Sequence, residues 1–392
     1  MASIFRVQVY LTDKASRRLP LLLCFLAAMV MLMPCSSRAE TSYRSVAGPC
    51  HLEFPRDHGP HPGYATEWWY YTGNVKSGSG SPFGFQLTFF RHQFVPPGDE
   101  TGWPKLPSAW RTPQIYIAHL ALSDIMEGTY RHVEQMARGA VGLADATSDL
   151  EKTSVFVKDW SLEIRHEDSI HHLTAVAEDF GMNLILSQEK PPVLHGQNGY
   201  SLKGKAADSA SCYYSLTRMS VHGDLVVRGQ SIPVQGSAWM DHEFSTAPLE
   251  SDLLGWDWFS LQFSDRTELM IYLLRQKDGG MSPASSGTFV DASGTTTALV
   301  FQDIAVEALD HWQSPHSGGS YPVRWAIKII PLKMELTIAA QLKDQEMNTP
   351  GTTRITYWEG SVSVKGNGKD GKPVTGEGYV ELTGYDKPLN LP

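Results

Sequence analysis

The sequence predicts an all-β protein made of two related β domains. Short runs of β-branched and aromatic residues recur along the chain with turn residues between them, which is typical of antiparallel sheets. The sequence contains no long amphipathic helix. Strands do not alternate with helices, so nothing indicates a parallel sheet. The 34 Gly and 24 Pro fit a turn-rich β protein, and 392 residues are enough for two domains.

The first 39 residues are predicted to be a cleaved secretory signal peptide. Basic residues precede the apolar run Leu19–Met33, and Ser37–Ala39 supplies small residues at the usual cleavage spacing. A retained anchor is the alternative, but the apolar run is shorter than the ~20 residues that span a bilayer. A lipoprotein signal ending at Cys35 is a second alternative, for which Pro34 is a poor neighbour. Periplasmic or secreted localisation follows.

Cleavage would change the charge and the cysteine count. The leader carries five basic residues and one acid, so the net charge would move from −9 to −13. Such a balance argues against nucleic acid and anionic membrane surfaces as partners. Cys50 and Cys212 would remain, and in an oxidising compartment they either pair or stay as two buried thiols.

The mature chain begins with an irregular lead-in, Tyr43–Tyr64, rich in Pro, Gly and His. Its histidines match no compact metal-ligand spacing, so we expect a solvated loop and no metal site. Further on, Thr129–Asp145 is compatible with a short helix or a loop. The remaining segments with strand character are Glu67–Val75, Phe83–Phe94, Ile115–Ser123, Ser154–Ile164, Ile170–Glu178, Asn183–Gln188, Tyr213–Val221, Leu225–Val227, Ile232–Met240, Trp256–Phe263, Glu268–Gln276, Gly287–Val290, Ala305–Trp312, Tyr321–Ile330, Met334–Leu342, Tyr357–Val364 and Gly378–Tyr385.

An internal echo supports two tandem domains. EWWYYTGNVKSGSGSPFGFQLTFFRHQ parallels GWDWFSLQFSDRTELMIYLLRQ, each with a Trp-rich strand, a polar turn and an apolar strand that ends near Arg and Gln. Duplication of one β unit explains the echo. We therefore expect an N-terminal domain over 40–245 and a C-terminal domain over 246–392.

The stretch Gly236–Arg275 concentrates the residues suited to chemistry. It places Asp241, His242 and Glu243 in a row on a predicted strand, followed by a Trp-x-Trp strand and a strand that contains Tyr272. Because side chains alternate along a strand, His242 should lie on one face and the two acids on the other. The acids then either act on that other side or serve structure by pairing with an arginine or with loop backbone.

The motifs EWWYYTGNV, FGFQLTFFR, AHLALSD, WMDHEF, GWDWFSLQF and GEGYVELTGY resemble the AttH-like and carotenoid 1,2-hydratase (hydroxyneurosporene synthase) family, often described as predicted secreted hydrolases. The resemblance extends from about Gly63 to Tyr385. It implies two lipocalin-like antiparallel β-barrels of the calycin group, and it implies no cofactor.

The resemblance also implies site positions. Hydratases of this family add water to a double bond of an acyclic carotenoid, which requires a general acid in an apolar pocket. Their His and Trp fall on His242 and Phe244, and their Tyr and acidic residue fall on Tyr272 and Leu274. The loss of the acid argues against the carotenoid reaction. Asp241 and Glu243 are not expected to replace it in the cavity of His242.

Candidate catalytic residues are therefore His242, Tyr272 and Asp241. The candidate ligand-binding residues share aromatic character; they are Phe244, Trp256, Trp258, Trp69, His92 and His119. For His119 and the tryptophans a plain core role remains open. No G-x-S-x-G, H-E-x-x-H, P-loop, G-x-G-x-x-G or C-x-x-C motif is present, so the corresponding chemistries lack support.

Three functions remain open. The first is a secreted or periplasmic lipocalin-like protein that binds an apolar ligand, such as a lipid or isoprenoid, within or between its barrels. The second is a hydratase or related lyase that acts on an isoprenoid or unsaturated lipid. The third is an envelope accessory factor that contacts components of a transporter.

Overall fold

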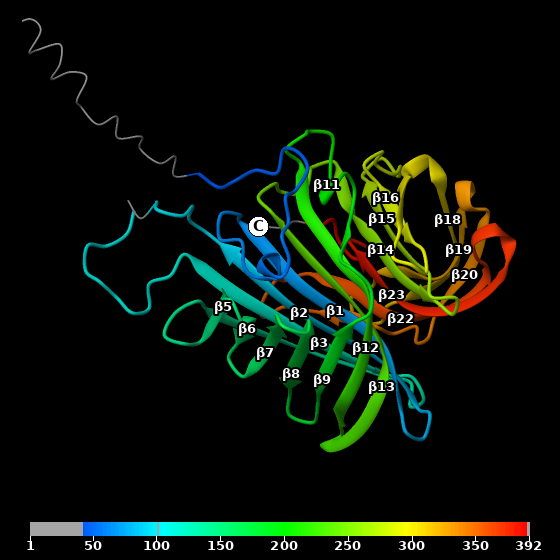
Figure 1. The fold of residues 1–392 in the computed structure, drawn as a ribbon, viewed down its shortest axis with the longest axis horizontal. Helices are drawn as coiled ribbons and strands as arrows, with labels where there is room; N and C mark the ends of the chain where they lie inside the picture. Colours follow the sequence, from blue (N-terminus) through cyan, green and yellow to red (C-terminus); the bar gives the residue numbers. More distant parts are fainter. Residues whose placement is uncertain (1–41, 100–101, 390–392) are drawn as a thin grey trace, which may run out of the picture. The chain divides into compact units, whose positions relative to one another are not determined.

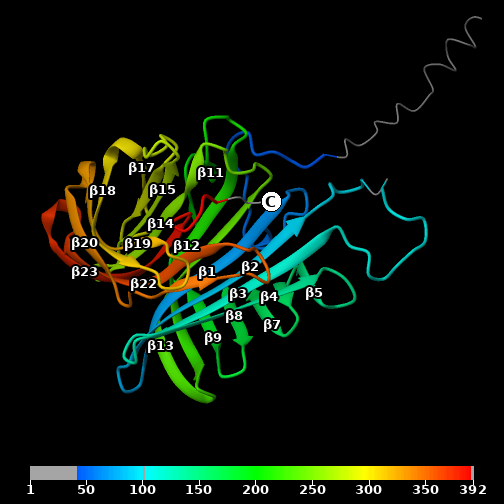
Figure 2. The ribbon, with the colours of Figure 1, turned by 180° about the vertical axis from the view of Figure 1, so that it is seen from behind.

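The computed structural model describes residues 42–99 and 102–389, and the predicted signal peptide lies outside them. Within these residues the protein is all-β, as predicted, and contains no α-helix (Figures 1 and 2). Its only helical turns are of the 3₁₀ type: η1 (Arg56–His58), η2 (Phe301–Asp303), η3 (Ile330–Leu332) and η4 (Lys369–Gly371). In the described part of the chain, no helix is long and apolar enough to cross a membrane.

The first half of the chain forms a 13-stranded antiparallel sheet that curls into a nearly closed barrel. Its main path runs β4-β3-β2-β1-β13-β12-β9-β8-β7-β6-β5, and β10 and β11 pair with β12. The strands are β1 (Thr66–Ser77), β2 (Pro82–Gln93), β3 (Gln114–Asp124), β4 (Thr129–Arg138), β5 (Ala144–Ser148), β6 (Lys152–Val157), β7 (Trp160–Arg165), β8 (Ile170–Val176), β9 (Phe180–Gln188), β10 (Val193–Leu194), β11 (Tyr200–Leu202), β12 (Ala210–Val227) and β13 (Gln230–Ser245).

The second half forms a ten-stranded antiparallel half-barrel with the path β17-β16-β15-β14-β23-β22-β20-β19-β18, and β21 pairs with β22. Its strands are β14 (Leu253–Phe263), β15 (Glu268–Gln276), β16 (Ser286–Val290), β17 (Thr296–Val300), β18 (Ile304–Gln313), β19 (Ser320–Ile329), β20 (Met334–Ala340), β21 (Glu346–Asn348), β22 (Thr356–Asn367) and β23 (Pro373–Thr383). The first sheet ends at Ser245 and the second sheet begins at Leu253.

Both sheets share one topology. The first strand of each sheet pairs with the second strand and with the last one, β1 with β2 and β13, and β14 with β15 and β23. In both, the arginine near the end of the second strand pairs with an acid on the first: Arg91 with Glu67, and Arg275 with Asp257. The internal echo in the sequence therefore corresponds to two equivalent hairpins.

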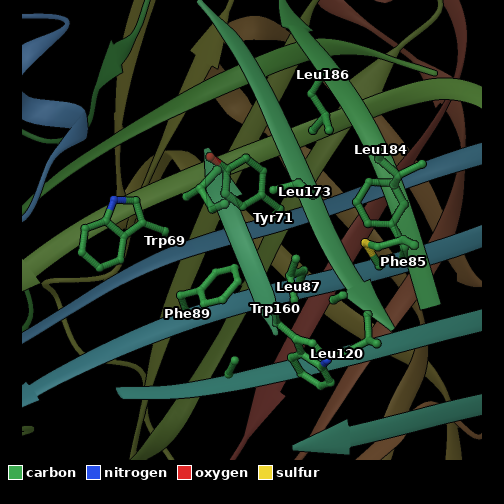
Figure 3. Packing of buried hydrophobic residues seen from close by; sticks show 14 of the residues in the cluster. Trp69, Tyr71, Phe85, Leu87, Phe89, Leu120, Trp160, Leu173, Leu184 and Leu186 are labelled. Atoms are coloured by element: carbon green, nitrogen blue, oxygen red, sulfur yellow. The ribbon is translucent and has the colours of Figure 1, made fainter. Parts of the chain in front are cut away.

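The interior of the first barrel is a packed core. Figure 3 shows Trp69 and Tyr71 of β1 and Phe85, Leu87 and Phe89 of the neighbouring β2, which lie side by side in the core of the barrel. All five side chains are fully buried, and they include most of the core face that the alternation in β2 predicted. Dense packing of this kind leaves the barrel interior to side chains rather than to a large ligand.

The expectation of a helix or loop over Thr129–Asp145 is wrong for most of this segment, because β4 and the start of β5 occupy it; only residues 139–143 between the two strands form a turn. β4 is the edge strand of its sheet, and nearly all of its residues are half-buried or exposed. A strand without a fully buried face shows no apolar alternation, so the sequence pattern had no period of two to reveal it. Likewise, the single predicted strand Ser154–Ile164 is two strands joined by a turn at Lys158, whose φ is positive.

The outer face of the first barrel packs against the second sheet. Tyr70 donates a hydrogen bond to Glu359 (2.6 Å), and the Asn74 amide donates to the carbonyl of Gly378 (3.1 Å). An apolar cluster fills the rest of this contact, which we call the junction. Its buried members are Tyr70, Tyr213, Trp239, Leu253, Trp258, Met270, Tyr272, Leu274 and Tyr379.

Candidate functional site

The acid–His–acid triplet on β13 divides between two environments, as the strand alternation predicted. His242 points into the first barrel beside Trp69 of β1, with ring centroids 4.8 Å apart. Asp241 and Glu243 point the other way, toward the junction. The triplet therefore contributes to two separate groups of polar side chains, one at the end of the barrel and one between the sheets.

The barrel-end group is centred on Glu67, the second residue of β1. Its Oε1 atom lies 2.9 Å from His242 Nε2 and 2.7 Å from His61 Nδ1, and its Oε2 atom accepts a hydrogen bond from Arg91 Nε (2.9 Å). Glu67, His242 and Arg91 are almost completely buried. A buried carboxylate thus holds two imidazoles and one guanidinium together.

Hydrogen bonds extend this group in two directions. Tyr214 OH lies 3.0 Å from His242 Nδ1 and 2.7 Å from His58 Nδ1. On the other side, His61 Nε2 lies 3.4 Å from Asp57 Oδ1. Both nitrogens of His61 and His242 therefore have polar partners, and the rings are fixed in orientation.

The charges of the group follow from these contacts. Burial would raise the pKa of Glu67, but the hydrogen bonds to His242 and His61 outweigh it and hold that pKa well below its usual range. Burial lowers the pKa of His61, yet its bonds to Asp57 and Glu67 raise the pKa overall. For His242 burial dominates, and the pKa is lowered. The ionised Glu67 is the fixed negative charge of the barrel end.

A cavity of about 620 Å³ adjoins this group, and we call it the N-terminal cavity. The lead-in segment forms one wall and Phe244 belongs to the other. His61 lines the cavity and stacks on Phe244, with ring centroids 3.7 Å apart. His61 contacts both the buried Glu67 carboxylate and this open space, which Asp57 also lines.

The prediction that the lead-in is a solvated loop is wrong for His58 and His61, whereas His51 is exposed. His58 is buried against Tyr214, and only 16% of the His61 side chain is exposed. The structure also bonds Cys50 to Cys212, with Cα atoms 5.9 Å apart, so the pairing alternative holds. The sequence did not indicate His58 and Glu67 because their partners Tyr214 and His242 lie 156 and 175 residues away, on β12 and β13. It did not indicate His61 because the role of His61 depends on Glu67, which that long-range contact positions.

The junction group is centred on Asp241, which is 4% exposed. Its carboxyl accepts hydrogen bonds from Tyr213 OH (2.6 Å), Trp239 Nε1 (2.6 Å) and the Ser215 hydroxyl, and Trp258 Nε1 donates to Tyr213 OH (3.0 Å). All of these partners are neutral. Burial raises the pKa of Asp241 to about 7, although the hydrogen bonds act in the opposite direction.

Tyr272 lies in the junction, on the same side of β13 as Asp241. Its hydroxyl donates to the carbonyl of Leu202 (2.6 Å), and Lys203 Nζ lies 4.4 Å from its ring centroid. The same ammonium pairs with Glu243 (2.9 Å) and lies 4.9 Å from the Tyr213 ring. Lys203 thus links Tyr272 to the Asp241 group.

His242 and Tyr272, the pair expected from the sequence, have contacts in different places, the barrel end and the junction. Leu274, at the family's acid position, also lies in the junction. We expected Asp241 to lie away from the missing acid because we placed that acid in the cavity of His242. In the structure, the acid position Leu274 lies in the junction with Tyr272, and Asp241 lies on this side of β13 too.

The aromatic candidates divide in the same way. Trp258 and the half-buried Trp256 belong to the junction, whereas Trp69 and Phe244 surround His242.

The histidine candidates lie elsewhere. His119 is buried on β3, with Nδ1 2.8 Å from Tyr357 OH and Nε2 3.0 Å from Thr352 Oγ1, so both ring nitrogens are occupied by contacts with the second half of the chain. His92 packs against Phe94 near the end of β2.

One set of side chains could hold a cation. The ligand atoms of His61, Glu67 and His242 lie within 4.8 Å of one another. Among residues 42–99 and 102–389, these three form the group of His, Cys, Asp or Glu side chains that lie close enough together to bind one metal ion.

Comparisons with known proteins agree with this architecture. The AttH-like family model matches residues 45–385. A putative AttH from Nitrosomonas europaea is 34% identical, over 87% of this chain and 99% of its own, with a TM-score of 0.76. Kievitone hydratase from Nectria haematococca (14% identity, 88% and 97% coverage, TM-score 0.64) and CghA in complex with Sch210972 (14%, 87% and 95%, 0.51) share the fold. A search of curated proteins finds no match. The chain belongs to the AttH-like family.

Proposed function

We propose that this protein binds an unsaturated apolar small molecule at the junction and adds water to, or removes it from, a carbon–carbon bond of that molecule, with Asp241 as the general acid. The observation that supports this proposal most strongly is that Asp241 is a buried carboxyl whose hydrogen-bond donors, Tyr213, Trp239 and Ser215, are all neutral. A carboxyl in such surroundings can deliver a proton, which a carboxylate paired with arginine cannot do as readily.

The geometry suits the charge that such a reaction develops. Protonation of an alkene carbon by Asp241 leaves a carbocation, and the faces of Trp239, Trp258 and Tyr213 can stabilise a cation at close range. Attack of water on the cation forms the C–O bond, and the water proton returns to the Asp241 carboxylate. The half-buried Trp68, Trp256 and Leu249 pack against the junction cluster, and we expect an apolar molecule to enter beside them.

Side chains fill both the first barrel (Figure 3) and the junction, so binding at the junction requires its aromatic side chains to move apart. A comparison with a solved structure supports hydratase chemistry. Kievitone hydratase shares the fold at 14% identity and is by its name a hydratase. The alternative is that the protein only carries an apolar ligand, and the experiment below distinguishes this alternative from catalysis.

Replacement of Asp241 by Asn tests the proposal. Incubation with pooled unsaturated lipids and isoprenoids in ¹⁸O-labelled water, followed by mass spectrometry, should reveal hydrated products with the wild-type protein. The D241N variant should lose product formation by about 100-fold or more, the usual size of a general-acid effect. The exposed turn variant D265N is the matched control and should match wild type. A bound but unchanged ligand in wild type, or full activity in D241N, would refute the enzymatic role.

We also propose that the protein acts in an oxidising compartment outside the cytoplasm. The Cys50–Cys212 bond supports this, since disulfides persist in such compartments. N-terminal sequencing of the protein purified from its native host should begin near Glu40. A chain that retains Met1 would contradict the predicted cleavage.

A further inference from the structure

We propose that His61, Glu67 and His242 bind a divalent transition-metal ion, with Zn²⁺ as the best-fitting candidate, at the inner end of the N-terminal cavity. The spacing of the lead-in histidines in the sequence predicts no metal site, and the junction chemistry uses none of these three side chains. Two imidazoles and one carboxylate with a free fourth position are the donor set of open zinc sites. The three ligand atoms lie within 4.8 Å of one another.

The ligands come from elements that the fold holds together. Glu67 and His242 lie on the paired strands β1 and β13, where Glu67 faces Phe244 and Trp69 faces His242 in the register. His61 comes from the lead-in, whose backbone N–H at His61 also donates to the Glu67 carboxylate (2.9 Å). Two ligands are therefore rigid, and the third is on a loop anchored to the same carboxylate.

The outer contacts of both histidines match those of metal-ligating imidazoles. Such histidines present one nitrogen to the ion, and the other nitrogen bonds to a carboxylate, a carbonyl or another polar group. His242 presents Nε2 to the centre and has Tyr214 OH at 3.0 Å from Nδ1. His61 presents Nδ1 and has Asp57 Oδ1 at 3.4 Å from Nε2. Both rings are thus already oriented with the ligating nitrogen inward.

The Glu67 carboxylate is also held in an orientation suited to metal binding. Arg91 Nε holds Glu67 Oε2 at 2.9 Å, and this contact leaves Oε1 facing the two histidines. Hydrogen-bonded carboxylates of this kind are usual around metal sites. Arg91 opposes a cation electrostatically, but Glu67 and the nearby Asp57 together supply two negative charges to a divalent ion.

Metal binding requires a small spreading of the ligands. Ligand atoms about 2.0–2.2 Å from one tetrahedral ion are separated by roughly 3.3 Å. Glu67 Oε1 lies 2.7 Å from His61 Nδ1 and 2.9 Å from His242 Nε2, so each distance must grow by about half an ångström. Movement of His61, on a loop beside the N-terminal cavity, lengthens the first distance, and a rotation of the Glu67 carboxylate or the His242 ring lengthens the second. The cavity also gives the ion its route in and a place for the fourth ligand.

Metal analysis of the full chain, produced without a histidine tag or chelator, tests this inference. Wild-type protein dialysed against Zn²⁺ should retain one equivalent by inductively coupled plasma mass spectrometry. Substitution of Co²⁺ should give the visible absorption of a tetrahedral site. The H61A variant should bind Zn²⁺ at least 100-fold more weakly, more than the loss of an outer contact causes. The matched control is H51A, because His51 is an exposed residue that lines the same cavity.

The wild-type measurements decide the proposal even if H61A does not fold. Retention of less than a tenth of an equivalent by wild type, together with no tetrahedral Co²⁺ spectrum, would show that the group is an ion-free hydrogen-bond network. Equal Zn²⁺ binding by wild type and a folded H61A would place the ion elsewhere and also overturn the proposal. Since neither readout depends on turnover, failure here is separate from failure of the hydratase proposal.

Discussion

Removal of the Cys50–Cys212 bond is expected to lower the free energy of unfolding by up to about 5 kcal/mol, the value that the loop-entropy relation gives for a closure this long. The two cysteines are 162 residues apart in sequence. The bond also holds the lead-in, with His58 and His61, against β12. Without it, the lead-in depends on contacts such as the hydrogen bond from Cys50 N to the carbonyl of Asn198 (3.0 Å).

Urea denaturation of wild type and of a C50S/C212S variant measures this effect. Dithiothreitol should shift the midpoint of wild type toward that of the variant and should leave the variant unchanged. A proteolysis assay should show earlier cleavage within the lead-in when the bond is absent. Equal midpoints for oxidised wild type and the double variant would show that the bond contributes nothing to stability.

Replacement of Glu359 by Gln is expected to stabilise the protein at alkaline pH and to change little near pH 5. Glu359 is fully buried on β22; Tyr70 donates to its Oε1, and its Oε2 has no hydrogen-bond partner among the described residues. Burial, followed by the nearby Glu381, raises the pKa of Glu359 well above its usual range. The folded protein therefore keeps this carboxyl protonated where the unfolded chain ionises it.

The sign of the pH dependence follows from that difference. A raised carboxyl pKa stabilises the folded state fully below the unfolded pKa of about 4.3, and the contribution is lost as pH rises toward the folded pKa. The loss is about 1.4 kcal/mol per pH unit for one group. Glutamine does not ionise, so the E359Q variant should lack this part of the decline. The advantage over wild type should therefore grow from pH 5 to pH 8.

Chemical denaturation at several pH values checks this expectation. The matched control is E335Q, which alters an exposed glutamate that is 61% accessible. Its stability should parallel wild type at every pH. Parallel curves for E359Q and wild type would show that Glu359 is ionised in the folded protein, with a counter-charge that the junction does not reveal.

Local sequence patterns were enough to identify the fold. The alternation in β2 marked its core face, and the repeated Trp-rich hairpin indicated two related sheets, because both signals depend only on neighbours along a strand. The β4 edge strand was missed for the same reason, since a strand without a buried face has no alternation. Alternation on β13 also separated His242 from Asp241 correctly.

The location of chemistry was decided by tertiary structure alone. The sequence could say that Asp241 and His242 face opposite ways, but which of them shares a site with Tyr272 depends on how β15 packs against the outside of the first barrel. Likewise, the sequence identifies His61 only as a loop residue, and the tertiary structure places Glu67 and His242 beside it. Strand periodicity extends over a few residues, whereas these contacts join segments up to 175 residues apart, and only the packing of the whole chain determines them.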